Sequence, residues 1–99
     1  MHASVIEGKF KPGTRDEALA KVDGLVDELS SKVEGLRAFI ILDRGDDRST
    51  TIALYETKEN WEAAAPVAAD ILGQMGPYFA EMPERTGCEV MLAKRFVTD

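Results

Sequence analysis

Few residues in this chain could act as nucleophiles or metal ligands. Cys88 is the only cysteine among 99 residues, so neither an internal disulfide nor a thiolate metal cluster can form. We expect its thiol to be buried and inert, because Cys88 lies in a strand pattern. Asp43, Asp46 and Asp47 surround a predicted turn but lack the alternating ligands and distal acid of a calcium loop. We therefore predict a solvated turn there, with no metal site and no cofactor elsewhere.

A second group of residues could surround a small molecule. The candidate walls of such a pocket are aromatic or sulfur-containing: Tyr55, Trp61, Met75, Tyr78 and Phe79. The candidate polar groups lie on predicted strands: Glu7, Arg37 and Arg95. Apolar walls with a few convergent polar groups are typical of a site for a hydrophobic or aromatic ligand. No residue among them identifies a substrate.

Several of these candidates also have a purely structural interpretation. Trp61 could wedge between helix and sheet, because aromatic side chains dominate core burial. Tyr55 could lie at a subunit interface with its hydroxyl at the rim. The two arginines could form ion pairs with glutamates of neighbouring strands. The sequence leaves both interpretations open.

Periodicity predicts the elements that must position these residues. Strands are expected where short apolar runs are bounded by turn residues, at 2–10, 36–44, 49–56 and 87–97. A helix follows the first strand, with Thr14 and Glu17 as a capping box and Gly35 as its stop. A second helical region begins after Thr57 as N-cap, and Pro66 must kink or break it. The alanine-rich stretch around that break either leaves space over the sheet or packs closely against it.

The order of these elements predicts the fold class and the assembly. The order β-α-β-β-α-β is that of an α+β, ferredoxin-like fold, a four-stranded antiparallel sheet with both helices on one face. Residues 1–99 suffice for one domain without a second core. The second strand is apolar on both sides, with Leu36, Ala38, Ile40 and Leu42 opposite Phe39 and Ile41. Because monomers rarely leave such a face bare, we expect two sheets to pack face to face in a homodimer.

The charge balance argues against two classes of partner. A formal net charge of −6 leaves no basic stripe for nucleic acid or for an anionic membrane surface. No apolar run approaches the ~18 residues of a membrane span. Residues 1–10 also lack the apolar core of a signal peptide. We therefore expect a cytoplasmic protein that binds neither nucleic acid nor membrane.

Two stretches carry a resemblance to a known family. Residues 33–36 (VEGL) lead into the second strand, and residues 51–61 (TIALYETKENW) join a strand to the second helical region. Both resemble the antibiotic-biosynthesis monooxygenase (ABM) branch of the dimeric α/β-barrel superfamily, although the usual proline before Gly35 is absent. Length and element order match over essentially the whole chain. Neither stretch is catalytic in that family, so the resemblance specifies fold better than activity.

Activity in that family depends on individual residues. Its haem-degrading members use a histidine on the second helical region and an asparagine on the first strand, and this chain has neither there. We therefore do not expect haem degradation. Its cofactor-independent monooxygenases oxidise acidic phenols, with polar residues that stabilise the substrate anion. The resemblance thus implies a small oxygen-dependent enzyme for a hydrophobic or aromatic molecule.

The alternative is a non-catalytic dimer with a ligand-binding, stress-related or structural role. A cavity of about 300 Å³ or more beneath the second helical region, with convergent polar groups, would favour the enzyme. A solid apolar core at that place would exclude it.

Overall fold

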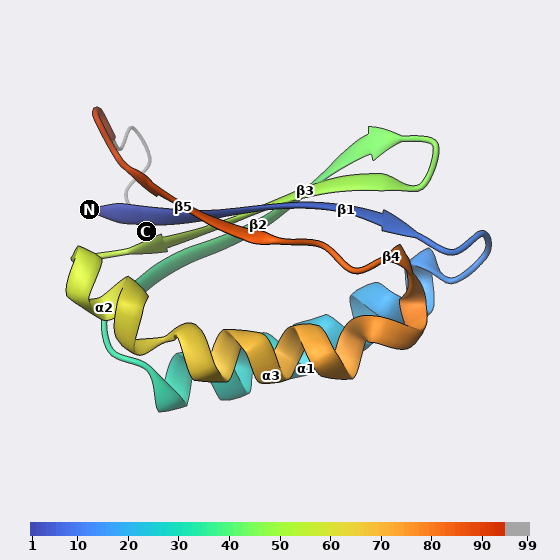
Figure 1. Cartoon of the computed structure of the whole chain (residues 1–99), viewed down its shortest axis with the longest axis horizontal. Helices are drawn as coiled ribbons and strands as arrows, with labels where there is room; N and C mark the ends of the chain where they lie inside the picture. The colour runs from blue at the N-terminus through green and yellow to red at the C-terminus, as the bar shows by residue number, and fades with distance from the viewer. Residues whose placement is uncertain (95–99) are drawn as a thin grey trace.

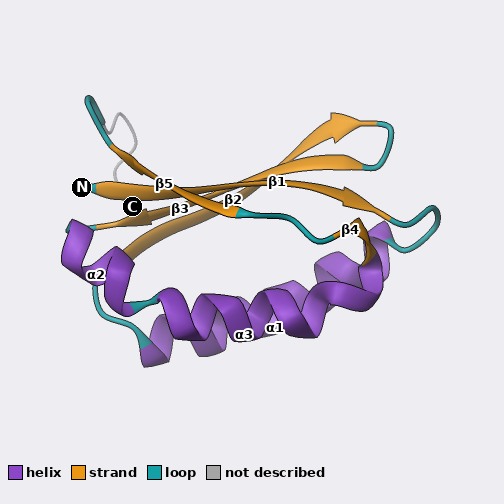
Figure 2. Cartoon of the chain, in the orientation of Figure 1, coloured by secondary structure: helices purple, strands orange, loops and turns teal. Residues whose placement is uncertain are grey.

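The computed structural model describes residues 1–94. Its strands are β1 (His2–Phe10), β2 (Leu36–Gly45), β3 (Arg48–Tyr55), β4 (Phe79–Glu81) and β5 (Arg85–Glu89). Its helices are α1 (Arg15–Lys32), α2 (Lys58–Ala63), α3 (Ala65–Met75) and the short 3₁₀ helix η1 (Gly76–Tyr78). The sheet forms one layer, and the helices form a second layer against one of its faces (Figures 1 and 2). Within residues 1–94, no helix has the length and apolar character needed to cross a bilayer.

The sheet is antiparallel and has the ferredoxin-like order. β3 lies between β2 and β1, and both β4 and β5 pair with the other edge of β1. β5 pairs with residues from His2 to Ile6, while β4 pairs with Lys9 and Phe10. The two short strands thus flank β1 in succession, as one interrupted edge strand. The predicted fold class is confirmed, with five strands in place of four.

The last strand lies earlier in the chain than the prediction of 87–97. It ends at Glu89, which pairs with His2 at the start of β1. One further backbone hydrogen bond joins the N–H of Val90 to the carbonyl of Met1 at 3.1 Å, and the next residues, Met91 and Leu92, are 95% and 75% exposed. The remainder of the predicted strand, residues 95–97, lies outside the described residues. Hydrophobic alternation alone could not show where the pairing partner ends.

Helix α1 ends as predicted but begins differently. Gly35 has a positive φ of +79°, a conformation that glycine adopts without steric cost after a helix. At the other end, Thr14 makes no side-chain cap, so the predicted capping box is wrong. Its hydroxyl instead donates to the carbonyl of Lys11 at 2.8 Å and to that of Tyr78 at 3.3 Å. Thr14 therefore ties the start of α1 to the end of the second helical region.

The second helical region breaks at the predicted place. Thr57 caps α2, because its hydroxyl oxygen accepts from the backbone N–H of Asn60 at 3.0 Å. α2 ends at Ala63, and Pro66 occupies the first turn of α3, where its missing N–H costs no hydrogen bond. Gly76 and Pro77 then stop the α-helix. The result is a short α2 followed by a longer α3, joined at the buried Ala64.

The β2–β3 hairpin confirms the turn interpretation of the aspartates. Asp46 and Asp47 form a two-residue turn with φ of 55° and 62°. Positive φ at both central residues is the geometry that matches the twist of paired strands. Asp43 accepts from the backbone N–H of Gly45 at 2.9 Å and pairs with Arg15 at 3.2 Å. Within residues 1–94, no three His, Cys, Asp or Glu side chains gather as a metal site requires.

The sheet has two different faces. The inner face lies under the helices and carries two clusters of buried apolar residues, one around Phe10 and Met75 and one around Ala53 and Tyr55. The outer face carries the alternate residues of the same strands. Its aliphatic side chains are partly exposed, Ile40 at 45% among them. Cys88 is exposed on β5, contrary to the expectation of a buried thiol, because that strand lies at the edge of the sheet.

The two stretches that carry the family resemblance touch each other. The backbone N–H of Glu56 donates to the carbonyl of Gly35 at 2.8 Å. A side chain at Gly35 would also collide with Asn60, because a Cβ there would lie 2.6 Å from Asn60 Cγ. Glycine at this position therefore serves both the end of α1 and the start of α2. These stretches therefore help to hold the helices on the sheet.

Candidate functional site

A cavity of about 60 Å³ lies between the inner face of the sheet and the helices. Its walls are formed by residues of the strands β1, β2 and β3 and of the helices α1 and α3, together with Phe79 and Arg85. The surface that it exposes is almost entirely apolar. The residues of helical origin that line it are Val22, Val26, Leu29, Ala68, Ile71, Leu72 and Met75.

Short polar side chains create this space on the sheet. Ser4, Ser49 and Thr51 point toward the helices at positions where the other inner-face residues are aliphatic or aromatic. Ser4 is 1% exposed and Ser49 is 5% exposed, so both hydroxyls lie inside the fold. A serine or threonine fills less volume than a leucine, and close-packed interiors do not collapse fully around such a difference. The cavity therefore follows from the choice of small residues on the central strands.

One end of the cavity lies beside a positively charged side chain. Arg85, at the start of β5, lines the cavity together with Tyr55 and Ser4. Its guanidinium carbon lies 4.4 Å from the centre of the Trp61 ring and 5.8 Å from that of Tyr55. The same group donates a hydrogen bond of 2.9 Å to the backbone carbonyl of Trp61. Two aromatic rings and one carbonyl thus hold the cation in place.

Arg85 has no carboxylate partner among residues 1–94. The three ion pairs formed within that part of the chain are Arg15–Asp43, Arg37–Glu56 and Lys58–Glu62. A partly buried guanidinium without an acidic partner retains much of its capacity to bind an anion, because ring faces and a carbonyl leave the charge uncompensated. This end of the cavity is therefore suited to a ligand that carries a negative oxygen.

Trp61 lies beside the same end of the cavity, in contact with Ser4 and Arg85. Its indole N–H donates to the hydroxyl of Ser4 at 2.8 Å. Its ring lies against Gly87 of β5, where a Cβ would approach Cη2 to 2.6 Å. The ring of His2 packs on it at 4.8 Å between centres, with the planes tilted by 57°. Glycine at position 87 thus leaves the space that the indole occupies.

The structure brings together some of the candidate pocket walls and separates others. Tyr55, Met75 and Phe79 line the cavity, whereas Trp61 is outside the lining and contacts two lining residues, Ser4 and Arg85. Tyr55 is 1% exposed on the inner face, so it does not lie on the outer face where a second sheet would pack. Tyr78 lies outside the lining. Its ring packs on the Phe10 cluster, and Lys21 Nζ lies 5.8 Å from the centre of that ring.

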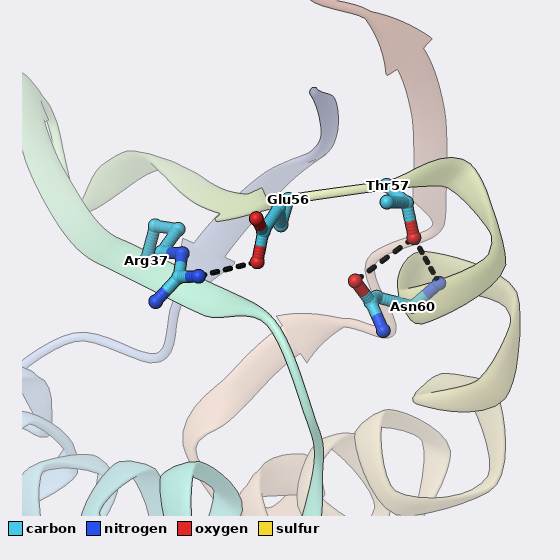
Figure 3. Close-up of polar contacts among 4 residues, drawn as sticks. All are labelled: Arg37, Glu56, Thr57 and Asn60. Carbon is cyan, nitrogen blue, oxygen red and sulfur yellow. Dashed lines mark hydrogen bonds and ion pairs between the residues drawn. The ribbon is translucent and has the colours of Figure 1, made fainter.

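The candidate polar groups do not converge on the cavity. Glu7 lies on the outer face, where it accepts a hydrogen bond of 2.9 Å from the hydroxyl of Thr50. Arg37 forms an ion pair with Glu56 at the exposed ends of β2 and β3, next to the Thr57 cap of α2 (Figure 3). Arg95 lies outside the described residues. Neither Glu7 nor Arg37 lines the cavity.

Sequence reasoning missed the residue that gives the site its charge. Arg85 precedes the predicted strand 87–97, so the strand pattern does not assign it to the sheet. Arg85 and Gly87 lie two residues apart on one strand, so both face the same side of the sheet. This is the side against which Trp61 packs. Ser4 could have been found from its position between apolar neighbours on a strand whose other even-numbered residues face the helices.

The volume of the cavity limits what the present conformation can hold. A cavity of about 150 Å³ encloses benzene, and one of about 15 Å³ encloses a water molecule. At about 60 Å³ the cavity admits small molecules of a few atoms but no aromatic ring. It is smaller than the 300 Å³ expected of an enzyme pocket, yet it is neither solid nor wholly apolar. A larger ligand needs a wall of the cavity to move.

Comparisons with known proteins find similarity in structure but none in sequence. No family model matches the chain, and no curated protein matches it. A "putative antibiotic biosynthesis monooxygenase" from Nitrosomonas europaea superposes with a TM-score of 0.75 at 14% identity, over 93% of this chain and 100% of that one. A protein of the same description from Chloroflexus aurantiacus gives 0.68 at 17% identity, over 98% and 100%.

A third solved structure holds a ligand. It is a mutant of MhuD with two manganese protoporphyrin IX molecules bound per active site, and it superposes with a TM-score of 0.70 at 19% identity, over 96% of this chain and 99% of that one. Likeness at these identities shows the fold. The chain therefore has the fold of ABM-like dimeric α/β-barrel domains, as the resemblance predicted.

Proposed function

We propose that this protein binds a hydrophobic, aromatic molecule between its sheet and its helices and oxidises it with molecular oxygen, without a bound cofactor. The observation that carries this proposal is the cation of Arg85 at the end of an otherwise apolar cavity, without an acidic partner among residues 1–94. The ABM-like fold supports the same reaction class, because two structures of similar fold are described as monooxygenases of this kind.

The chemistry uses Arg85 to hold the substrate as an anion. A nearby positive charge favours the ionised form of an acidic phenol, and the apolar walls strengthen that attraction by excluding water. The phenolate is rich in electrons and reacts with oxygen at a ring carbon. One oxygen atom forms the new carbon–oxygen bond, and the other leaves as water when the ring becomes a quinone. The phenol supplies all the electrons, so no further reductant is needed.

Oxygen uptake tests the reaction directly. With 1-naphthol as the probe, the wild-type protein should consume oxygen faster than the probe alone, with release of a quinone. Arg85→Met keeps most of the side-chain length and removes the charge, so it should lose this activity. Lys58→Met removes an exposed cation that is not among the residues lining the cavity and should retain it. Equal oxygen uptake with and without the protein would exclude the enzymatic function for this probe.

A non-catalytic role is the second candidate, and the size of the cavity favours it. A cavity of about 60 Å³ is below the volume at which a pocket encloses a substrate of ten or more atoms. In this case the protein binds an aromatic anion at Arg85 without consuming oxygen. Binding in a thermal-shift assay together with unchanged oxygen levels would identify this alternative.

We also propose that the outer face of the sheet binds a second copy of the chain. Its partly exposed aliphatic residues form a contiguous apolar surface across three strands: Val5, Ala38, Ile40, Leu42, Ile52 and Leu54. Two such faces related by a two-fold axis would cover each other. Sedimentation velocity at micromolar concentration should show a species of twice the 10.9 kDa chain mass. A monomer over the whole concentration range would contradict the homodimer.

A further inference from the structure

The indole of Trp61 occupies a slot whose shape and polar groups suit a planar aromatic ring. The floor of the slot is Gly87, where the absence of a side chain leaves room for the ring. Ser4 accepts a hydrogen bond from one edge of the indole, and Arg85 lies over its face at 4.4 Å. The ring of His2 packs against it. The ring of Tyr55 lies 5.8 Å from the guanidinium carbon of Arg85, and both residues line the neighbouring cavity.

The helix that carries Trp61 is weakly held. α2 has six residues, none of them buried, and ends at the break before α3. Trp61 makes two hydrogen bonds to the sheet: its indole N–H donates to Ser4, and its backbone carbonyl accepts from Arg85. The strands that form the opposite wall are tied into the sheet ladder by continuous backbone pairing. α2 adjoins the cavity at the lining residues Ser4 and Arg85, and it is the element beside the cavity that can move with the smallest loss of contacts.

Trp61 also occupies the guanidinium of Arg85, to which an anionic ligand would bind. Arg85 donates to the backbone carbonyl of Trp61, an uncharged acceptor, at 2.9 Å. A carboxylate or phenolate is a stronger acceptor for a guanidinium, because the bond is then assisted by both charges. An aromatic anion that reaches Arg85 replaces the carbonyl and the indole face together. Release of Trp61 also joins the slot to the cavity of about 60 Å³ and so provides the volume that an aromatic ring needs.

We propose that Trp61 is an internal occupant of an aromatic-anion site, and that a ligand binds by displacing its indole from Gly87, Ser4 and Arg85. The ligand is a planar aromatic ring with one anionic oxygen, which takes the place of the indole with its charge on Arg85. This inference rests on the proposed binding site but does not require that the protein oxidises its ligand. It assigns to Trp61 a role opposite to that of a pocket wall, because the indole excludes the ligand.

The two roles predict opposite effects of one substitution. If the indole is an occupant, Trp61→Ala leaves the slot vacant, so benzoate should bind at least about tenfold more tightly than to the wild type, since no closed state must be opened first. If the indole is a wall, the same substitution removes contacts and weakens binding. Isothermal titration calorimetry measures both affinities. Tyr78→Ala is the matched control, because it removes an aromatic ring that packs on the same side of the sheet but lies outside the cavity.

A second measurement needs no substitution. Trp61 is the only tryptophan in the chain, so the intrinsic fluorescence reports on this residue alone. Saturation of the wild-type protein with benzoate should shift the emission to the red and increase quenching by acrylamide, because the indole moves into water. Cyclohexane carboxylate, which is not planar, should produce a smaller shift at the same concentration.

The outcomes separate this inference from the proposed reaction. Tighter binding of benzoate by Trp61→Ala, or its release of wild-type Trp61 to solvent, supports the slot even if no phenol is oxidised. Weaker binding by the variant, or unchanged acrylamide quenching at saturation, overturns it even if oxygen is consumed. Absence of benzoate binding to both proteins also overturns it.

Discussion

The two faces of the sheet are formed by alternate residues of the same strands, yet the helices cover only one of them (Figure 1). The inner face alternates aliphatic residues with Ser4, Ser49 and Thr51, and these small polar groups leave a cavity beneath the helices. The outer face carries larger aliphatic residues in the alternate positions and leaves Ile40 45% exposed. The comparison shows that unfilled space arises where side chains are too small to fill a covered layer, whereas an exposed apolar surface arises where large side chains lack a cover.

The largest expected effect comes from the inner face. Phe10 is 6% exposed and stacks on Phe79 with 5.5 Å between ring centres, so Phe10→Ala should lower the free energy of unfolding by about 3–5 kcal/mol. Ile40→Ala removes a half-exposed side chain from the outer face and should cost about 1 kcal/mol or less in the monomer. Urea denaturation at low protein concentration measures both. Similar losses from the two variants would mean that the faces do not differ in burial.

The outer face should dominate assembly in the same way that the inner face dominates folding. Ile40→Lys places a charge in the centre of the proposed sheet-to-sheet contact and should weaken dimerisation by about 100-fold, because an unpaired charge is costly to bury. Ala20→Lys adds the same charge to the exposed side of α1 and should leave dimerisation unchanged. Sedimentation velocity over a dilution series distinguishes the two. A wild-type dimer that survives Ile40→Lys would place the contact elsewhere.

The attachment of the helices to the inner face depends on one glycine. Gly35→Ala forces a side chain into a left-handed conformation and against Asn60, and should destabilise the protein by about 1–3 kcal/mol. Gly24 lies in the middle of α1 with open space around its Cα, so Gly24→Ala should instead stabilise by about 0.5–1 kcal/mol. Thermal unfolding of the two variants should therefore shift in opposite directions. Shifts of the same sign would sink this account of Gly35.

Local signals in the sequence were sufficient for most of the fold. Gly35, Thr57 and Pro66 act through the backbone conformations that their own residue types favour, and each marks the boundary that the structure shows. The hairpin turn at Asp46 and Asp47 follows from the same kind of rule. These features could be predicted because their energies depend on residues within a few positions of each other.

The errors arose where a distant partner decides the outcome. The hydroxyl of Thr14 donates to the carbonyls of Lys11 and Tyr78. Tyr78 is distant in sequence, so a capping rule based on local spacing does not predict this contact. The end of β5 depends on where β1 begins. The same misplacement hid Arg85, since its relation to Trp61 and Tyr55 exists only after three segments meet. Of the predicted wall residues, Tyr55, Met75 and Phe79 line the cavity, whereas Arg85 was not among the candidates.

The central claim is that the inner-face cavity recognises an aromatic anion through Arg85. The most direct test compares the affinity of the protein for 4-nitrophenol, an acidic phenol, with its affinity for 4-nitroanisole, in which a methyl group removes the charge. The wild type should bind the phenol at least about tenfold more tightly, and Arg85→Met should abolish that preference while it retains binding to the ether. An undiminished preference for the phenol in Arg85→Met would contradict the account.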